Sequence, residues 1–541
     1  MKMKKFTQMG SHICVVLCSM VAAFFLMAST KATYNGDVYG LYTENFMTPF
    51  QLTDVFLWLV FTVVCSAAIF GMTKLYGRFG KLLFSECEKK FSDRKFFVVV
   101  SGLIFVAWIP YFLTYYPGGI YSDSFTSLYQ VLYSVFSNRH PLLFTVGVGA
   151  CVLPGMKIFG SLAAGTMTYT IVQSLVMAMV LGYFVLWMRR KGIRPVVYIA
   201  AAIFMAVFPL YPFYAIAMWK DTPFSLALLL YSLYLIDVIQ SDGAKLEDFP
   251  GVLKYLILTF FVCFYRNNGI YIALLVHGTL TVLYWKRMLH TLKQFQALSL
   301  LCIAGYFILY GPVYHALNLA TDPVESLGIP NQQIFAVFSL EEGEYTEEEA
   351  EFISQIWDLE EIPEKYAPLL ADVPKWYMER FDEDFLDAHL SEYFKTWFTL
   401  CTKNFELYVR AWLMETLTFW SPLHSGWEAY IMPGVWPNEY GLYQQNLLQE
   451  MTGIRFGDLV EPDTYLSPGL LFWVAMLFGG TAFHAAPKGK KIKAFVPMLP
   501  LMGLWITIMI ATPIGISLRY LYMVVMVLPL NPIYPMLFQE D

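Results

Sequence analysis

The sequence predicts an all-α polytopic membrane protein, and three observations lead to this prediction. Hydrophobic residues make up 57% of the 541-residue chain and charged residues only 14%, whereas a soluble domain carries roughly 25% charged residues. Apolar runs of about 20 residues, the length that crosses a bilayer, recur along the chain. Lys and Arg gather in a few short stretches between those runs.

About twelve transmembrane helices are predicted from these runs. The first follows Lys2, Lys4 and Lys5 and resembles a signal peptide, but a second run follows soon after it, so we expect an uncleaved first helix. A short run, 252–264, is expected to pair with the following one as a hairpin. The other expected spans are 13–29, 53–73, 97–115, 165–187, 196–217, 221–239, 268–285, 295–314, 467–485, 493–511 and 518–536.

The basic stretches predict the topology, because Lys and Arg are enriched in cytoplasmic loops. They lie at the N-terminus and within 74–95, 189–194, 286–287 and 488–493. All of them face the cytoplasm only if the apolar stretch 141–159 does not cross the membrane. We therefore expect 141–159 to form a helix along the external surface, with both termini cytoplasmic. The alternative is an ordinary span with one exception to the charge rule.

This topology divides the chain into three parts. Residues 1–314 form an N-terminal transmembrane module, whose external loop 116–164 is expected to carry the catalytic site. Residues 315–466 form an external, mostly helical segment, and 467–541 a C-terminal transmembrane module. From Asp322 to Glu392 the external segment holds 20 Asp or Glu against 3 Lys or Arg. Thr346 to Glu349 predict a capping-box helix start, and 385–420 an external helix or helix pair.

Polar residues recur at the outer ends of the predicted spans. Asp123 follows two glycines in YPGGIYSDS, Lys220 follows a tryptophan in WKDTPFS, Arg266 opens RNNG, and Arg519 is next to last in ATPIGISLRY. Because all four turns face outward in this topology, we expect one site at the outer membrane boundary. Lys220, Arg266 and Arg519 suit a phosphate, and Asp123 could accept a proton from a hydroxyl.

Simpler interpretations of the same residues remain open. Asp123 could cap a helix, and Lys220 with Asp221 could form a local ion pair at a helix start. Arg266 and Arg519 could extend toward lipid headgroups. His140, before a proline, could simply begin a helix.

A carboxylate base beside a cationic phosphate site, open to lipid and to the outside, predicts group transfer from a lipid-linked phosphate donor to a hydroxyl. Nucleotides are not available outside the cell, so the expected donor is a polyprenyl-phosphate sugar. The chain has no phosphate-binding glycine loop and no metal-type cysteine spacing. Tyr121 and Trp219 would stack on sugar faces. Membrane lipid is an expected partner and nucleic acid is not.

Several strings carry a resemblance to a known superfamily. YPGGIYSDS, SNRHPLLFT, WKDTPFS, YRNNG, ESLGIPNQQI and ATPIGISLRY resemble the GT-C integral-membrane glycosyltransferases, most closely an uncharacterised GT-C-like family of Gram-positive bacteria. The resemblance implies a GT-C-like helical bundle with external surface helices. It also implies that Asp123 is the general base and that Lys220, Arg266 and Arg519 bind the donor phosphate.

Further residues are implied by the same resemblance. Arg139-His140-Pro141-Leu142 is similar to a His-Pro-Pro-Leu segment of the superfamily but lacks its second proline. Many members carry paired acids where this chain has Asp123 alone, so a divalent metal (Mg or Mn) is possible only if another carboxylate contributes. The expected substrate-binding residues are Arg139, His140, Asp221, Asn267, Glu325, Gln332, Tyr121, Trp219 and Tyr520.

The resulting expectation is a multi-pass enzyme of the cell membrane with an extracellular active site. It would transfer a hexosyl or pentosyl group, with inversion, to a cell-envelope glycan, lipid or protein. Two other classes stay open, a flippase for lipid-linked saccharides and a polysaccharide polymerase. A non-catalytic scaffold would make Asp123 dispensable and 340–395 essential.

Overall fold

The computed structural model describes residues 2–85, 91–138, 140–317, 319, 327–425, 434–460, 466–512 and 514–539. The regular structure of this part of the chain is almost entirely helical. Its one sheet has two short antiparallel strands, β1 (Ala32–Thr33) and β2 (Phe46–Met47). The protein is thus an all-α protein, as the apolar runs predict.

Within the described ranges, nine helices are long and apolar enough to cross a membrane. A tenth is added if α7 (Pro195–Val207) and α8 (Leu210–Ile216), which meet at 54°, are one bent span. Two shorter apolar helices, α10 (Phe249–Tyr265) and α11 (Gly269–Leu283), form the expected hairpin. The protein is a multi-pass membrane protein, while the number twelve is not confirmed. The nine include α1 (Lys2–Ser29), α2 (Leu52–Phe79), α3 (Asp93–Thr114), α5 (Leu142–Phe159), α6 (Leu162–Arg190), α9 (Asp221–Gln240), α13 (Lys293–Ile308), α24 (Pro468–Ala485) and α26 (Leu499–Ile510).

Outside the cap and the C-terminal stretch, both described below, the other helical elements are short. They are α4 (Ser122–Tyr133), α12 (Trp285–Met288), α14 (Tyr314–Ala316), α21 (Leu417–Trp420), α22 (Leu447–Thr452), α23 (Gly457–Val460), α25 (Lys491–Phe495), η1 (Gly80–Leu83), η2 (Ala244–Leu246), η3 (Leu309–Val313), η5 (Val373–Tyr377) and η7 (Val496–Met498).

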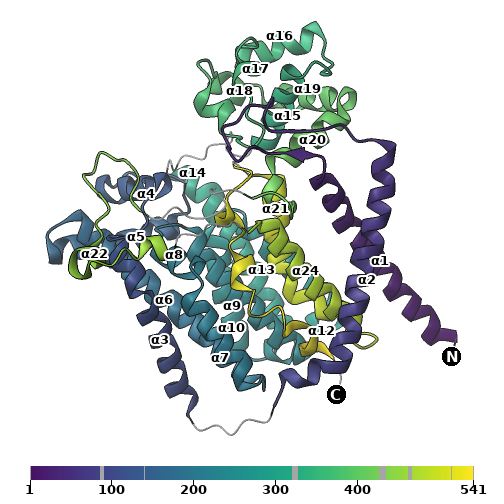
Figure 1. The fold of residues 1–541 in the computed structure, drawn as a ribbon, viewed down its shortest axis with the longest axis vertical. Coiled ribbons are helices and arrows are strands. Elements are labelled where there is room, and N and C mark those ends of the chain that lie inside the picture. Colours follow the sequence, from purple (N-terminus) through teal and green to yellow (C-terminus); the bar gives the residue numbers. More distant parts are fainter. Residues whose placement is uncertain are drawn as a thin grey trace.

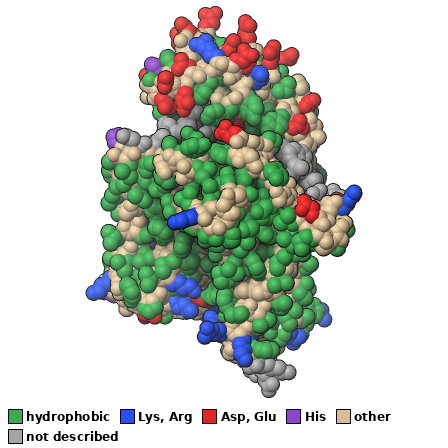
Figure 2. All heavy atoms as spheres, turned by 90° about the vertical axis from the view of Figure 1, so that its left-hand side faces the viewer, with side chains coloured by type: hydrophobic (Ala, Val, Ile, Leu, Met, Phe, Trp, Pro, Cys, Tyr) green, Lys and Arg blue, Asp and Glu red, His purple; other side chains and the backbone are tan. Residues whose placement is uncertain are grey.

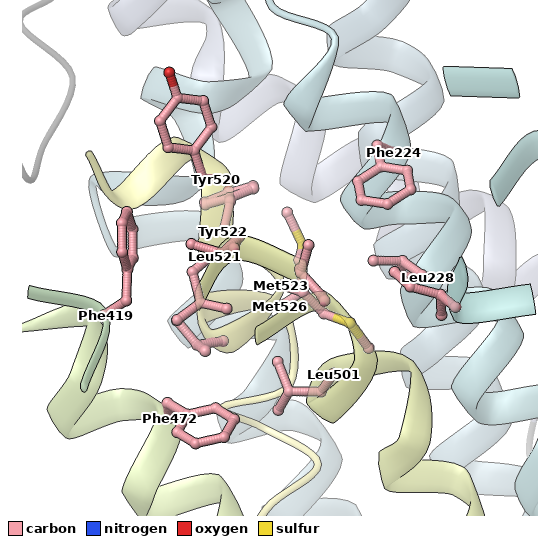
Figure 3. Packing of buried hydrophobic residues seen from close by; sticks show 14 of the residues in the cluster. Phe224, Leu228, Phe419, Phe472, Leu501, Tyr520, Leu521, Tyr522, Met523 and Met526 are labelled. Carbon is pink, nitrogen blue, oxygen red and sulfur yellow. The ribbon is translucent and has the colours of Figure 1, made fainter. Parts of the chain in front are cut away.

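The predicted last span, 518–536, is not one helix. It consists of short turns, η8 (Leu518–Leu521), α27 (Met523–Met526) and η9 (Tyr534–Phe538). Pro529, Pro532 and Pro535 recur every third residue and prevent a continuous helix. Irregular backbone at membrane depth must be covered by protein. Figure 3 shows that cover: Leu521, Met523 and Met526 pack among side chains of α9, α21, α24 and α26.

The helix α5 packs closely across the first turns of α6. A side chain at Gly155 would lie 2.4 Å from the Thr168 hydroxyl and 3.0 Å from the Gly165 Cα atom, so the two helices meet without room for a larger residue. In Figure 1, α4, α5 and α22 gather at one side of the bundle. Because α5 has the length and composition of a span, its placement along the external surface stays a prediction.

A helical cap, defined as residues 328–415, stands above the bundle (Figure 1). The capping box predicted at its acidic helix is confirmed: Thr346 N donates to Glu349 Oε2 at 2.8 Å, and Glu349 N donates to the Thr346 hydroxyl at 3.3 Å. On the face that Figure 2 presents, Asp and Glu gather on the upper lobe, and Lys and Arg lie mostly around the opposite end. The cap contains α15 (Gly328–Ser339), α16 (Glu347–Ile356), α17 (Ile362–Lys365), α18 (Glu383–Ala388), α19 (Leu390–Lys403) and α20 (Phe405–Glu415).

Candidate functional site

The loop before α4 holds Asp123 in place through its two glycines. Gly118 has φ +131°, and a side chain there would lie 2.5 Å from the Thr170 hydroxyl and 2.8 Å from the Ile216 carbonyl oxygen. Only glycine suits such a backbone in so little space. Gly119 exchanges backbone hydrogen bonds with the chain before α9, donating to Ile216 O at 2.9 Å and accepting from Met218 N at 2.8 Å. The loop that presents Asp123 is therefore fixed to the loop that presents Lys220.

Asp123 lies at the centre of a cluster of charged side chains. Its Oδ2 atom is 3.0 Å from Arg519 Nη1 and 3.3 Å from Lys220 Nζ. Lys220 Nζ also lies 2.8 Å from His140 Nδ1. These groups come from the first turn of α4, from η8, from the N-terminal end of α9 and from the residue before Pro141. Four separate parts of the sequence therefore meet at one carboxylate.

The two cations decide the charge of Asp123. Burial alone would raise the pKa of its carboxyl group, but the positive charges of Lys220 and Arg519 lower that pKa by more. The net result is a pKa well below the usual range. Asp123 is therefore an anion at any physiological pH.

A second ion pair lies beside the first. Arg266 Nη1 donates to Asp221 Oδ1 at 2.7 Å, and the Asp221 side chain is only 1% exposed. The Arg266 guanidinium lies over the rings of Tyr520, at 5.2 Å, and Phe224, at 5.7 Å. The aromatic contacts and the buried carboxylate hold Arg266 at the same end of α9 as Lys220.

Aromatic rings enclose Arg519 on two sides. Its guanidinium carbon lies 5.0 Å from the Trp219 ring centre and 4.6 Å from that of Tyr520. Its Nη2 atom also donates to the Tyr520 hydroxyl at 2.6 Å. Tyr121 packs against Trp219 with ring centres 4.4 Å apart. Figure 3 shows the Tyr520 hydroxyl pointing away from the apolar packing of Leu521 and Met523. Cation–π contact and hydrogen bonding together fix the position of Arg519.

Three polar atoms near these pairs are buried without a hydrogen-bond partner among the described residues: Trp219 Nε1, Asp221 Oδ2 and Asn268 Oδ1. A buried polar group without a partner costs about 1–3 kcal/mol. Native proteins keep few such groups, and each calls for a physical explanation. Two acceptors and one donor around cationic side chains suit a polar ligand that carries both hydroxyl groups and negative charge.

The structure brings together most of the predicted site residues and refutes two of the simpler interpretations. The N-terminal cap of α4 is Tyr121, not Asp123. Lys220 and Asp221 do not pair with each other, since Lys220 pairs with Asp123 and Asp221 pairs with Arg266. The predicted residues found in or against the cluster are Asp123, His140, Lys220, Asp221, Arg266, Arg519, Tyr520, Tyr121 and Trp219.

Two predicted residues, Asn267 and Gln332, lie outside this cluster. Asn267 is exposed, and its carbonyl accepts a hydrogen bond from the Tyr306 hydroxyl at 3.3 Å. The inward amide is that of Asn268, which donates to the Thr507 hydroxyl at 2.8 Å. Gln332 is fully buried inside the cap, where its Nε2 atom donates to the Ala367 carbonyl at 3.1 Å while its Oε1 atom has no partner among the described residues. Arg139 and Glu325 lie outside the described residues.

One segment that packs on the Asp123 loop, the chain around Val435, could not be identified from a sequence motif. Backbone hydrogen bonds run from Trp436 N to Ile120 O and from Ile120 N to Gly434 O, each at 2.9 Å, so the chain around Val435 lies along the Asp123 loop. The ring centre of Trp436 lies 5.9 Å from that of Tyr121. The only sequence signal was a Gly- and Pro-containing stretch, and residues 426–433 of it lie outside the described residues.

The carboxylates of Asp123 and Asp221 are a poor divalent-metal site. Asp123 already faces two cations and Asp221 faces one, and a divalent ion at these carboxylates would be repelled by those positive charges. Among the residues that the structure describes, no group of three or more His, Cys, Asp or Glu side chains is placed to hold a metal ion.

Fold and site together define a helical multi-pass membrane protein with a paired-charge cluster at the end of the bundle nearest the cap. Comparison with protein families matches residues 131–455 to DUF6020, a family of unknown function. That range covers more than half of the chain, which therefore belongs to this family. It includes His140, Lys220, Asp221 and Arg266 and leaves out Asp123 and Arg519. Neither a curated protein nor a solved structure matches the chain.

Proposed function

We propose that the protein is a GT-C-type glycosyltransferase that moves a sugar from a polyprenyl-phosphate donor to a hydroxyl acceptor. The observation that carries this proposal is the convergence of Lys220 and Arg519 on the carboxylate of Asp123, beside the pair of Arg266 and Asp221. Transfer of this kind needs cations for the departing phosphate and a base for the incoming hydroxyl. One site offers both.

The cations suit a phosphate ester in different ways. Arg519 and Arg266 present planar guanidinium groups, which match the geometry of phosphate oxygens, and Lys220 presents a point charge. Rings hold both guanidinium groups in position. Because these donors are oriented in advance, they would stabilise the charge that develops on the leaving phosphate with little reorganisation.

In the proposed reaction, the acceptor oxygen forms a bond to the anomeric carbon as that carbon's bond to the phosphate oxygen breaks. Asp123 takes the acceptor proton, and the polyprenyl phosphate leaves with the electron pair of the broken bond. A single displacement of this kind inverts the anomeric configuration. A carboxylate with a lowered pKa is a weak base. A donor phosphate that draws Lys220 and Arg519 toward itself would raise the pKa of Asp123, so donor binding would activate the base.

An apolar groove lies on α10, the helix that ends at Tyr265, next to Arg266. It has a volume of about 460 Å³ and is lined by Leu256, Ile257, Phe260, Phe261, Leu298, Leu301 and Cys302, from α10 and α13. Phe261 stacks on Tyr265, the residue before Arg266, with ring centres 5.6 Å apart. A polyprenyl chain in this groove would carry its phosphate to the cationic cluster.

The charge distribution supports an external site. The acidic cap stands at the end of the bundle where α4 lies (Figure 1), and on the face that Figure 2 presents Lys and Arg lie mostly around the opposite end. Basic residues are retained on the cytoplasmic side. The proposed site then opens to the outer leaflet, where lipid-linked sugars and envelope acceptors are both available.

The test is transfer by the purified protein in nanodiscs. A panel of radiolabelled polyprenyl-phosphate sugars is supplied with cell-envelope acceptors, with and without EDTA. We expect transfer by the wild type, little effect of EDTA, and a loss of about 1000-fold in Asp123→Asn. Asp458→Asn, which removes an exposed carboxylate of α23, is the matched control. Full activity of Asp123→Asn would refute the assignment, and translocation of donor without turnover would identify a flippase.

A further inference from the structure

A row of aromatic rings follows one side of α4, the helix that carries Asp123 in its first turn. Side chains four residues apart in a helix are neighbours on the same face. The α4 row, as we define it, has this spacing and starts at the N-terminal cap of the helix. Its members are Tyr121, Phe125, Tyr129 and Tyr133. The row begins at the charged cluster, because Tyr121 packs against Trp219.

The middle of the α4 row is fixed by packing. The Phe125 ring lies nearly parallel to that of Tyr440, at an angle of 7° and with ring centres 5.7 Å apart. Both rings rest on an apolar cluster that includes Leu128 and Leu442. Tyr440 belongs to 434–445, the chain that runs along the Asp123 loop. A second segment of the chain therefore adds a ring to the row.

Both ends of the row are open. Tyr129 and Tyr133 are 45% and 62% exposed, and their ring centres lie 4.8 Å apart. At the other end Trp436 is 49% exposed, and its ring centre lies 5.9 Å from that of Tyr121. A single exposed ring is ordinary, whereas adjoining exposed rings mark a surface that binds something.

The charges around the row favour water over lipid on its open side. Burial raises the pKa of the Tyr440 hydroxyl, and the neighbouring Glu439, Tyr133 and Tyr129 raise it further, so these side chains lie close together. Glu439 is exposed, and a carboxylate is costly in lipid. A surface for anionic lipid headgroups would carry Lys or Arg, and neither occurs in 123–138 or in 434–445.

We propose that the α4 row, together with Tyr440 and Trp436, is a binding site for a neutral glycan chain. The face of an aromatic ring is electron-rich and attracts the weakly positive C–H groups on the face of a sugar ring. This contact needs no charge, in agreement with the absence of Lys and Arg. Rings one helical turn apart, about 6 Å along the axis, can each meet a different part of one extended chain.

The row leads to the helix turn that carries Asp123, which gives the glycan a role. If the proposed function holds, on which this step alone rests, the bound glycan is the acceptor and presents a terminal hydroxyl to Asp123. The acceptor class is then a polysaccharide or oligosaccharide of the cell envelope. Binding of the glycan to the row does not itself require transfer.

Hydroxyl-radical footprinting of the full-length protein in nanodiscs, without donor, tests the glycan site. The probes are cellohexaose, maltohexaose and N-acetylchitohexaose, each compared with the same mass of its disaccharide so that radical scavenging is matched. We expect Tyr129 and Tyr133 to be oxidised in the free protein and to be protected about threefold by at least one hexasaccharide. Tyr345, an exposed ring of the cap, is the internal control and should not be protected.

Two outcomes would overturn the proposal. Protection by none of the three hexasaccharides would show that the row does not bind a neutral glycan. Tyr129 and Tyr133 that resist oxidation without any sugar, while Tyr345 is oxidised, would place the row in lipid.

Two double variants separate the rings from their hydroxyl groups. Tyr129→Ala with Tyr133→Ala should weaken hexasaccharide binding about tenfold, followed as protection of Trp436, because two stacking faces are lost. Tyr129→Phe with Tyr133→Phe keeps both faces and should bind within about twofold of the wild type. Tyr345→Ala is the matched control. An alanine double variant that binds as well as Tyr345→Ala would refute the role of these rings.

The glycan site and the proposed function can fail separately. Asp123→Asn should keep the protection by hexasaccharide, because Asp123 is not part of the row. Protection in a protein that never transfers sugar would leave the glycan site in place and reject the proposed function. Transfer by a protein whose row is not protected would reject the glycan site alone.

Discussion

Arg519 and Asp123 are 396 residues apart in the sequence, yet Arg519 Nη1 lies 3.0 Å from Asp123 Oδ2. The pairing is possible because two irregular segments, the glycine loop before α4 and the chain of short turns after α26, reach the same end of the bundle. Neither segment could present its charge from within a regular transmembrane helix, where the side chain would face lipid or apolar packing. The departures from helical structure are thus what build the site.

Replacing Arg519 with lysine should abolish most of the proposed activity. A lysine ammonium cannot reach Asp123, donate to the Tyr520 hydroxyl and lie between two aromatic rings at once, as the planar guanidinium does. We expect kcat/KM for the donor to fall about 100-fold, mostly through KM. Arg455→Lys is the matched control, because Arg455 is exposed. Equal kinetics of Arg519→Lys and Arg455→Lys would exclude a specific contact with the donor.

Removing Asp221 should destabilise the protein more than removing its whole ion pair. Asp221→Asn leaves Arg266, whose side chain is 14% exposed, without a counter-charge. Breaking a buried pair in this way costs about 3–5 kcal/mol. The double variant Asp221→Leu with Arg266→Met removes both charges and should be more stable than the single variant. Thermal unfolding in detergent compares the stability of the single and the double variant. A double variant less stable than Asp221→Asn would contradict this prediction.

Hydropathy and charge alone predict the main residues of the charged cluster. Each of four charged residues interrupts or borders an apolar run: Asp123, Lys220, Arg266 and Arg519. An ionisable residue is energetically costly there and stands out in the sequence. Their partners cannot be identified in the same way. Adjacent Lys220 and Asp221 look like a pair in the sequence, but the first turn of α9 points them to different neighbours. Only the packing of α4, α10 and η8 around that turn decides which carboxylate each cation meets.

The expectations that the structure does not bear out have equally local causes. Asn267 and Asn268 are equivalent in the sequence, and the start of α11 at Gly269 decides which of them faces inward. Gln332 lies in a helix whose buried side could not be known without the rest of the cap. The broken last span was signalled by the prolines at 529, 532 and 535, although the run of apolar residues around them predicts a helix.

His140 should act on the reaction through Lys220. Its Nδ1 atom lies 2.8 Å from Lys220 Nζ, and an ammonium ion donates to that nitrogen only when the imidazole is neutral. His140→Asn places an amide oxygen near the position of Nδ1 and should keep KM for the donor within about threefold of the wild type. His140→Leu removes the acceptor and should raise KM about tenfold. Equal effects of the two substitutions would show that the hydrogen bond to Lys220 is not what matters.

The stability contributed by Asp123 should persist to unusually low pH. Because the pKa of Asp123 is lowered by Lys220 and Arg519, its contribution is present above the ordinary value near 3.8 and is lost only as pH falls through the lower folded-state value. In Asp123→Asn the two cations face each other without an anion between them. The Asp123 side chain is 23% exposed, so the cost of Asp123→Asn at pH 7 is smaller than for a fully buried pair, on the order of 2 kcal/mol.

Unfolding of the wild type and of Asp123→Asn between pH 7 and pH 3 measures the difference in stability between the two proteins. The difference should stay nearly constant down to about pH 4, where an ordinary carboxylate would already have lost half of its charge. A difference that disappears by pH 5 would mean that Asp123 does not face both cations in the folded protein.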